Sequence, residues 1–205
     1  RVKHLLLNHG VEMPESFERM NNCWCRAFIK WLKEDVKLMS ETRRSLDILL
    51  DQVETTRKNL LKVTLEIRHL SQTDKYRKDY NLLFGIPGIG VITAMTLLTE
   101  VYDVTRFRNE KQFASYLGLI PTSHSSGDKV IHGEKTFRGN KQLGPMLIEA
   151  SWVAITKDPY LSVAYRTYLK RMTPQEAIVR VARKLSNIIF SVLKAGKAYV
   201  PFEGN

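Results

Sequence analysis

Cysteine is scarce in this 205-residue sequence, which has only Cys23 and Cys25. Their C-x-C spacing, with His4 and His9 upstream, is not a standard zinc-binding pattern, so we predict no metal site in this chain. Two cysteines that form no disulfide framework are typical of a reducing compartment. We therefore expect a cytoplasmic protein.

Long apolar runs are also missing. No segment approaches the length of a bilayer span, and no secretory signal is visible, so we expect no membrane partner. The sequence has no internal repeat and no low-complexity tract. It begins with Arg1 rather than Met, which leads us to expect a fragment of a longer protein.

Acidic side chains are outnumbered by basic ones, 21 against 32, which gives a formal net charge of +11. Such a surplus favours a polyanionic partner, and nucleic acid is the commonest one. A basic surface that only keeps the protein soluble is the alternative. The charge alone does not distinguish the two.

The pattern of apolar residues predicts a mainly α fold, and a hydrophobic content of 43% is enough for a buried core. We expect a long helical arm over residues 1–75 and a compact helical domain over 76–200. Residues 201–205 are expected to be a frayed tail.

Residues 39–73 are predicted to form one long helix, because no Pro or Gly interrupts them. Apolar residues recur every seven positions, which is typical of a coiled-coil seam. The repeating positions are Met39, Leu46, Val53, Leu60 and Ile67. Such a helix needs a partner. Dimerisation and antiparallel packing on residues 16–37 explain the seam equally well.

Residues 82–101 form an apolar segment that a glycine-rich turn interrupts. The whole segment is similar to a helix-hairpin-helix motif. Gly85, Gly88 and Gly90 would let backbone N–H groups approach a phosphate at a helix N-terminus. Such a contact does not depend on base sequence. A tight helix–helix turn without a ligand is the alternative.

Residues 118–139 are predicted to form a loop between two helical regions, apart from a short strand at 130–132. Ser123, Ser125 and Ser126 lie in it, among several glycines and cations. A hydroxyl beside fixed cations suits a nucleophile for phosphoester transfer. Ser-Ser-Gly is also an ordinary turn sequence, so the pattern alone leaves both interpretations open.

A capping box at Thr173–Glu176 predicts the start of a helix that runs to about Lys194. Its apolar residues form one stripe. Arg180, Arg183 and Lys184 lie on other faces, where they are either solvated or aligned along a phosphate backbone.

Taken in order, these segments resemble the C-terminal part of the DEDD transposases of bacterial insertion sequences. That family includes the pilin-gene invertases and the bridge-RNA-guided recombinases. The resemblance covers residues 75–200. It is carried by Gly85-Ile-Pro-Gly-Ile-Gly, Phe107-Arg108, Tyr116-Leu-Gly-Leu-Ile-Pro121, Ser125-Ser126-Gly127, Gly139-Asn140-x-x-Leu143 and Ala182-Arg-Lys-Leu185.

The resemblance implies a DNA strand-transferase whose C-terminal domain supplies a serine nucleophile. Ser126 is the first candidate and Ser125 the second. In the family an N-terminal RuvC-like domain holds Mg²⁺, and different protomers contribute to one composite site. No such domain is visible in this sequence, so we expect Mg²⁺ only in the intact enzyme. DNA is the expected partner, and a guide RNA is a further candidate.

The remaining candidate site residues are cations. Lys129, Lys135, Arg138 and Lys141 flank the serines and are candidates to neutralise phosphate. A competing hypothesis assigns the chain no chemistry. It would then be a nucleic-acid-binding and dimerisation module, held together by the glycine-rich turn, the basic helix and the segment 39–73.

Overall fold

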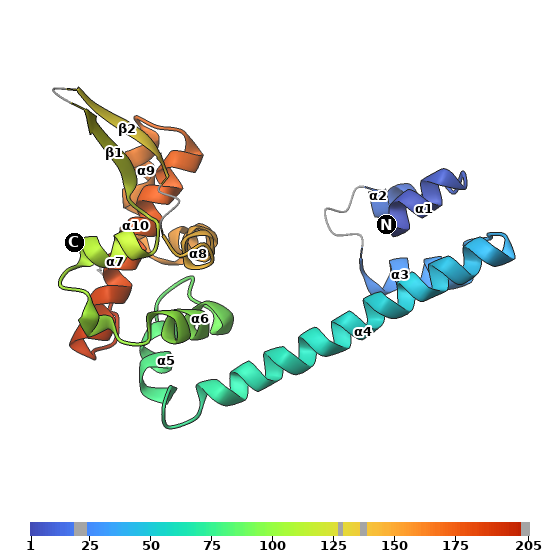
Figure 1. The fold of residues 1–205 in the computed structure, drawn as a ribbon, viewed down its shortest axis with the longest axis horizontal. Coiled ribbons are helices and arrows are strands. Elements are labelled where there is room, and N and C mark those ends of the chain that lie inside the picture. The colour runs from blue at the N-terminus through green and yellow to red at the C-terminus, as the bar shows by residue number, and fades with distance from the viewer. Residues whose placement is uncertain (19–23, 127–128, 136–138, 202–205) are drawn as a thin grey trace. The chain divides into compact units, whose positions relative to one another are not determined.

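The computed structural model describes residues 1–18, 24–126, 129–135 and 139–201. These residues are mainly helical, as predicted (Figure 1). Contacts divide the chain into two compact units, Arg1–Thr64 and Leu65–Asn205. The sequence placed this boundary near residue 75. The contacts place it inside a helix that contributes to both units.

The N-terminal unit is built from three short helices and most of a long one. Its elements are α1 (Val2–Asn8), α2 (Glu15–Glu18), α3 (Arg26–Glu34) and α4 (Ser40–Ser71), of which the last continues into the second unit. Phe28 and Leu32 of α3 pack against Leu46 and Leu50 of α4 in a small apolar core. The long uninterrupted helix predicted for residues 39–73 is therefore confirmed as α4.

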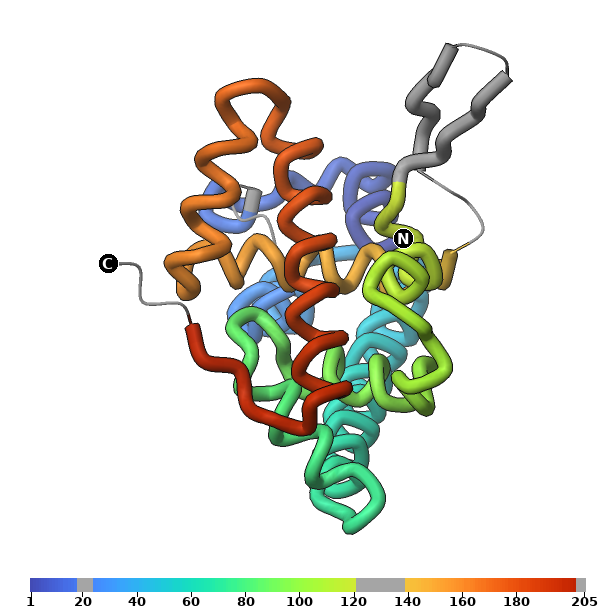
Figure 2. The backbone as a smooth tube through the Cα atoms, turned by 90° about the vertical axis from the view of Figure 1, so that its left-hand side faces the viewer, coloured from blue at the N-terminus to red at the C-terminus, as the bar shows by residue number. Residues whose placement is uncertain are grey.

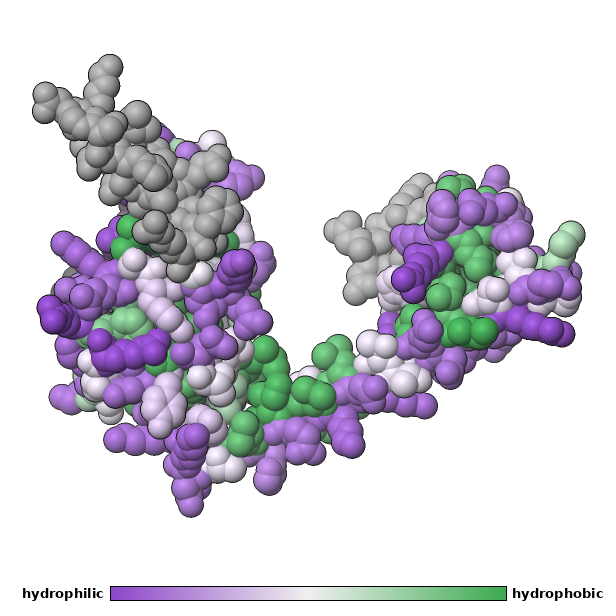
Figure 3. Space-filling model, in the orientation of Figure 1, coloured by the Kyte–Doolittle hydropathy of each residue, from purple (hydrophilic) through white to green (hydrophobic). Residues whose placement is uncertain are grey.

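The two halves of the predicted seam on α4 have different surroundings. Leu46 is fully buried against α3, so this part of the seam packs within the chain. Leu60 is 66% exposed, and several other apolar side chains of this helix are exposed with it. Figure 3 shows such side chains, in green, along the helix. The exposed apolar residues of α4 are Ile48, Leu60, Leu61, Val63, Leu65 and Leu70.

The second unit is a helical domain with one β-hairpin (Figures 1 and 2). Its elements are α5 (Arg77–Phe84), α6 (Val91–Val101), the short 3₁₀ helix η1 (Val104–Arg106), α7 (Glu110–Tyr116), β1 (Pro121–Ser126), β2 (Lys129–Lys135), α8 (Leu143–Lys157), α9 (Pro159–Leu169) and α10 (Pro174–Ala195). Helix α10 packs against α5, α7, α8 and α9, so it is the central element of this core.

The helix starts predicted from capping residues are confirmed. The Asn109 side chain accepts from Gln112 N at the start of α7. Thr173 and Glu176 form a reciprocal capping box on α10, and Pro174 occupies the first helical position. Because these side chains satisfy backbone N–H groups that have no partner inside the helix, they fix where each helix begins.

Candidate nucleic-acid interface and the base of the serine hairpin

The segment predicted as a loop contains an antiparallel hairpin, β1–β2. Strand β2 includes the short strand predicted at 130–132, where β-branched Val130 and Ile131 favour extended backbone. The serine-rich half has low strand propensity, and pairing with β2 is what makes it a strand. Loop propensity at residues 121–126 is therefore overridden by pairing.

The hairpin places two of the candidate serines opposite specific residues of β2. Ser126 pairs with Lys129 and Ser125 with Val130 in the register of the two strands. The first serine candidate thus lies next to the turn end of the hairpin. Lys135, another predicted phosphate contact, pairs with Pro121 at the opposite end. Arg138, predicted to contact phosphate, lies outside the described residues.

Two glycines lie against each other where the hairpin joins the helical domain. A Cβ atom built on Gly139 would lie 2.3 Å from Gly118 Cα, far inside van der Waals contact. Gly118 has φ +69°, and its position after α7 is that of a Schellman motif. In that motif Gly118 N donates to Ser115 O, and Leu119 N donates to Ala114 O. The close approach leaves no room for a side chain on Gly139.

Asn140 forms hydrogen bonds to three helices at this point. Its backbone N–H donates to Tyr116 O of α7 (2.7 Å), and its side-chain Nδ2 donates to Glu100 Oε2 of α6 (2.7 Å). Its Oδ1 accepts from Gln142 N and Leu143 N at the start of α8. Asn140 therefore fixes the chain as it leaves the hairpin. The sequence predicted only the last of these roles, a helix cap.

Tyr116 reinforces the same junction from α7. Its hydroxyl donates to Glu100 O (2.9 Å), and the guanidinium of Arg106 lies 4.7 Å from the centroid of its ring. The same guanidinium lies 4.7 Å from the Phe107 ring centroid. Glu100 thus accepts from both Asn140 and Tyr116, so α6 and α7 together hold the base of the hairpin. Lys141, the next predicted phosphate contact, is exposed beside this junction.

The glycine-rich turn joins α5 to α6, and its three glycines have different surroundings. Gly88 has φ +87°, and a Cβ there would lie 2.3 Å from the backbone oxygen of Ala150 in α8. Packing against α8 therefore accounts for the glycine at this position. Gly90 precedes α6 and has open space around its Cα, while Gly85 tolerates ordinary contacts. No side chain caps the first turn of α6, so its N–H groups remain available to an anion.

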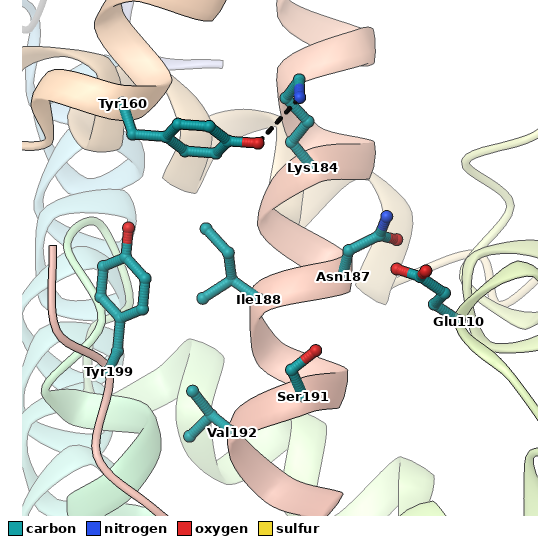
Figure 4. A pocket seen from close by; sticks show the side chains of 8 residues that line it. All are labelled: Glu110, Tyr160, Lys184, Asn187, Ile188, Ser191, Val192 and Tyr199. Atoms are coloured by element: carbon teal, nitrogen blue, oxygen red, sulfur yellow. Dashed lines mark hydrogen bonds between the residues drawn. The ribbon is translucent and has the colours of Figure 1, made fainter. Parts of the chain in front are cut away.

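The basic residues predicted on the last helix lie on the solvent side of α10. Arg180 is exposed, and Arg183 and Lys184 are partly exposed. Lys184 Nζ donates to Tyr160 Oη of α9 (2.9 Å) and lies 4.9 Å from the centroid of that ring (Figure 4). This hydrogen bond raises the pKa of the Lys184 ammonium above its ordinary value. The sequence did not single out Tyr160.

The hairpin and the basic residues of α10 form separate groups, but the helices that support them are in contact. Helix α10 packs against α7, and α7 also holds the base of the hairpin. The described residues do not include three or more His, Cys, Asp or Glu side chains placed to hold a metal ion. No helix in the described part of the chain is long and apolar enough to cross a bilayer.

Comparison with known proteins supports the resemblance found in the sequence. Residues 80–166 match the model of the transposase IS116/IS110/IS902 family. A Streptomyces coelicolor protein described as an uncharacterised 43.6 kDa protein of insertion element IS110 is 39% identical over 58% of this chain and 29% of its own length. The Coxiella burnetii transposase for insertion sequence element IS1111A is 28% identical, covering 63% of this chain and 37% of its own length.

A third relative is named for gene inversion. The pilin gene-inverting protein of Moraxella bovis is 33% identical over 58% of this chain and 38% of its own length. The predicted resemblance to insertion-sequence transposases is thereby confirmed. In these three alignments, the chain spans about a third of the length of its relatives. The matched region contains the glycine-rich turn, the hairpin and both glycines at its base.

Proposed function

We propose that this chain is the C-terminal part of an insertion-sequence DNA transposase or recombinase, and that its hairpin carries the serine nucleophile. The observation that supports the proposal most is the junction formed by Gly118, Gly139 and Asn140. It holds both ends of the β1–β2 hairpin against α6 and α7, within the region that matches the transposase family. A nucleophile must be held in a defined position relative to the phosphate that it attacks.

Ser126 is the proposed nucleophile and Ser125 the second candidate. In the reaction, serine Oγ forms a bond to the scissile phosphorus, and the bond from phosphorus to one bridging deoxyribose oxygen breaks. The hydroxyl proton is lost, and the departing oxygen gains a proton. The resulting phosphoserine keeps the phosphodiester bond energy, so a second DNA hydroxyl can rejoin the strand without ATP.

The serine needs activation, because a hydroxyl is a weak nucleophile at its ordinary pKa. A preceding RuvC-like domain would supply Mg²⁺ for this purpose, as the family resemblance implies. The cations of this chain would instead bind the flanking phosphates. Lys129, Lys135, Arg138 and Lys141 are proposed for this role around the hairpin.

DNA binding away from the serines is proposed for two further elements. The first turn of α6, after Gly90, would offer uncapped N–H groups to a phosphate, with Gly85 and Gly88 shaping the turn. Arg180, Arg183 and Lys184 would bind the backbone along α10. A guide RNA is a second possible polyanion for the same cations. Acting on bacterial DNA would place the protein in the cytoplasm.

Oligomerisation through α4 is part of the proposal. Leu60 of the predicted seam is exposed together with other apolar side chains of α4 as far as Leu70, and the chain itself does not cover them. A second copy would cover them and would bring two serines into one assembly. The same observation favours the alternative function, a nucleic-acid-binding and dimerisation module without chemistry.

The decisive experiment uses an enzyme that contains the preceding domain, with Mg²⁺ and DNA from the ends of its element. The readout is a protein–DNA adduct that resists denaturant. We expect the adduct with the unmodified enzyme and with Ser125→Ala, and its loss in Ser126→Ala. An adduct that survives both substitutions would remove the serine assignment. Strand exchange without any adduct would favour the module without chemistry.

A further inference from the structure

Two adjoining hollows lie beside α10 and are lined by residues of α7, α9, α10 and the segment after α10. One has a volume of about 320 Å³ and the other about 270 Å³. They share Tyr160 of α9, Ile188 of α10 and Tyr199, which follows α10 in the chain. In Figure 4 the side chains of Tyr160, Ile188 and Tyr199 border one space, and Val200 lines the smaller hollow. The shared part is therefore an apolar slot bordered by two aromatic side chains.

Both rings are held in place by hydrogen bonds. The Tyr199 hydroxyl donates to Asp158 Oδ2 (2.7 Å), and Asp158 is a buried residue that also caps α9 through Leu161 N. The Tyr160 hydroxyl accepts from Lys184 Nζ (2.9 Å). Tyr160 is nonetheless 40% exposed, so its ring is available to a ligand. Rings oriented before binding lose little conformational entropy when a ligand stacks on them.

Polar groups line the other side of the larger hollow. Asn187 and Ser191 of α10 and Glu110 of α7 lie there together with Lys184 (Figure 4). An amide, a hydroxyl and a carboxylate provide both donors and acceptors. The hollow therefore combines apolar walls with a polar edge, which suits a flat heteroaromatic ligand whose hydrogen-bonding groups lie on its rim.

Cations extend from this hollow along α10. At 100° per residue, Arg180, Lys184 and Lys194 lie on the same side of the helix as Asn187 and Ser191. From Arg180 to Lys194 the helix contains no acidic residue. A ligand in the slot would thus have positive charge beside it on α10. A nucleotide within a strand needs this arrangement, because its base is apolar on both faces and its phosphates are anionic.

We propose that the slot between Tyr160 and Tyr199 binds an unstacked base of a single-stranded nucleic acid, with the adjacent phosphates on the cations of α10. This inference rests on the proposed function, in which strand exchange exposes unpaired nucleotides. It adds a binding site for single strands that is separate from the serine hairpin. A base inside an intact duplex could not enter the slot, because its faces are covered by its neighbours.

The test measures the anisotropy of a labelled short oligothymidylate bound to the full 205-residue chain at fixed salt concentration. An abasic oligonucleotide of equal length and a duplex are the comparison probes. Both single strands carry the same phosphates, so their difference reports the base. We expect the oligothymidylate to bind more tightly than the abasic strand. Tyr160→Ala should weaken its binding about tenfold and remove most of that difference.

Two variants make the result specific to the ring in the slot. Tyr160→Phe keeps the stacking surface and loses only the bond to Lys184, so it should bind the oligothymidylate within about threefold of the unmodified chain. Tyr102→Ala is the matched control, because Tyr102 is 83% exposed and also has a lysine, Lys75, over its ring. It should not change the affinity. Unchanged thermal unfolding would show that each variant is folded.

Equal affinities for the abasic strand and the oligothymidylate would overturn the inference, as would an unchanged affinity in Tyr160→Ala. The slot would then fit an apolar side chain of a protein partner better. Duplex binding that persists in that case would leave the proposed DNA function intact. Oligouridylate serves as a final probe. Tighter binding of either the oligothymidylate or the oligouridylate supports the slot. The polymer that binds more tightly indicates whether the slot takes its bases from DNA or from RNA.

Discussion

Asn140 and Glu100 are joined by a hydrogen bond of 2.7 Å, although 40 residues separate them in the sequence. The bond, donated by the amide nitrogen of Asn140, connects the end of the hairpin to α6, and the amide oxygen of Asn140 caps α8. The Asn140 side chain therefore donates a hydrogen bond to α6 and accepts hydrogen bonds from α8. The two roles can be tested separately, because donation needs the amide nitrogen and acceptance needs the amide oxygen.

Asn140→Asp keeps an acceptor for the N-terminus of α8 and replaces the donor with a carboxylate facing Glu100. We expect a lower free energy of unfolding, by about 1–2 kcal/mol, because two anions then meet where a hydrogen bond was. Chemical denaturation measures the change. Adding Glu100→Gln should recover most of the loss, since Gln can donate to the new carboxylate. No recovery in the double variant would show that the side-chain pair does not hold the hairpin.

Gly139→Ala should destabilise the base of the hairpin. The added methyl group would meet Gly118 Cα at 2.3 Å, and backbone on both sides must move to accommodate it. We expect a loss of about 1–3 kcal/mol in thermal or chemical unfolding. The adduct assay should show a larger loss of activity than Gly85→Ala causes. If Gly139→Ala were as stable and active as the unmodified chain, the two glycines would not be in contact.

Gly88→Ala should be among the most destabilising changes in the glycine-rich turn. Its φ of +87° is unfavourable for alanine, and the new Cβ would lie 2.3 Å from Ala150 O. The expected cost is about 2–4 kcal/mol, combining backbone strain with overpacking. Gly85→Ala is the control in the same turn, because φ there is −71° and the nearest atom is 3.5 Å away. It should be neutral or slightly stabilising.

The exposed part of α4 predicts an oligomer that two substitutions should weaken. Leu60→Glu with Leu61→Glu should lower the oligomer mass in light scattering, because charged side chains would have to be buried in the interface. The helix and its monomer fold should persist. Leu46→Ala is the contrasting change, because Leu46 is fully buried in the chain itself, and it should cost about 2–5 kcal/mol of stability. A monomeric unmodified chain would contradict the proposed dimer.

The capping box of α10 predicts a dependence of stability on acid pH. Hydrogen bonds from the Thr173 backbone and hydroxyl hold the pKa of Glu176 below its usual value of 4.5. The carboxylate therefore contributes stability that is present above the unfolded pKa and is lost as the pH falls from about 4.5 through the lower folded pKa. Acid denaturation of Glu176→Gln should show a smaller loss over this range. Thr173→Ala should cost about 1 kcal/mol at neutral pH.

The helices could be predicted from the sequence because their signals are local. Capping residues such as Asn109 and Thr173 act within one turn, and the absence of Pro and Gly from α4 is visible without a structure. The strand at 121–126 could not be predicted in this way. Its residues favour turns, and only pairing with β2, which depends on a register between two segments, makes it a strand.

The junction at the base of the hairpin could not be predicted from local sequence patterns either. Gly139 and Asn140 contributed to the family resemblance, but the sequence gives no sign that one touches Gly118 and the other bonds to Glu100. The slot between Tyr160 and Tyr199 was also missed, because it forms only when α9, α10 and the segment after α10 pack together. Long-range contacts of this kind leave no periodic signal in the sequence. The serine assignment remains a prediction.

The contact between Gly118 and Gly139 means that the chain departs for the hairpin and returns to the helical domain at one place, while Leu119 is still buried in the core. The entropy of closing such a segment rises only slowly with its length. The hairpin can therefore be lengthened, shortened or replaced by another sequence without rebuilding the helices beneath it. The hairpin is an exchangeable segment on an unchanged helical domain. The distance of the proposed nucleophile from that domain could therefore evolve independently of the domain's stability.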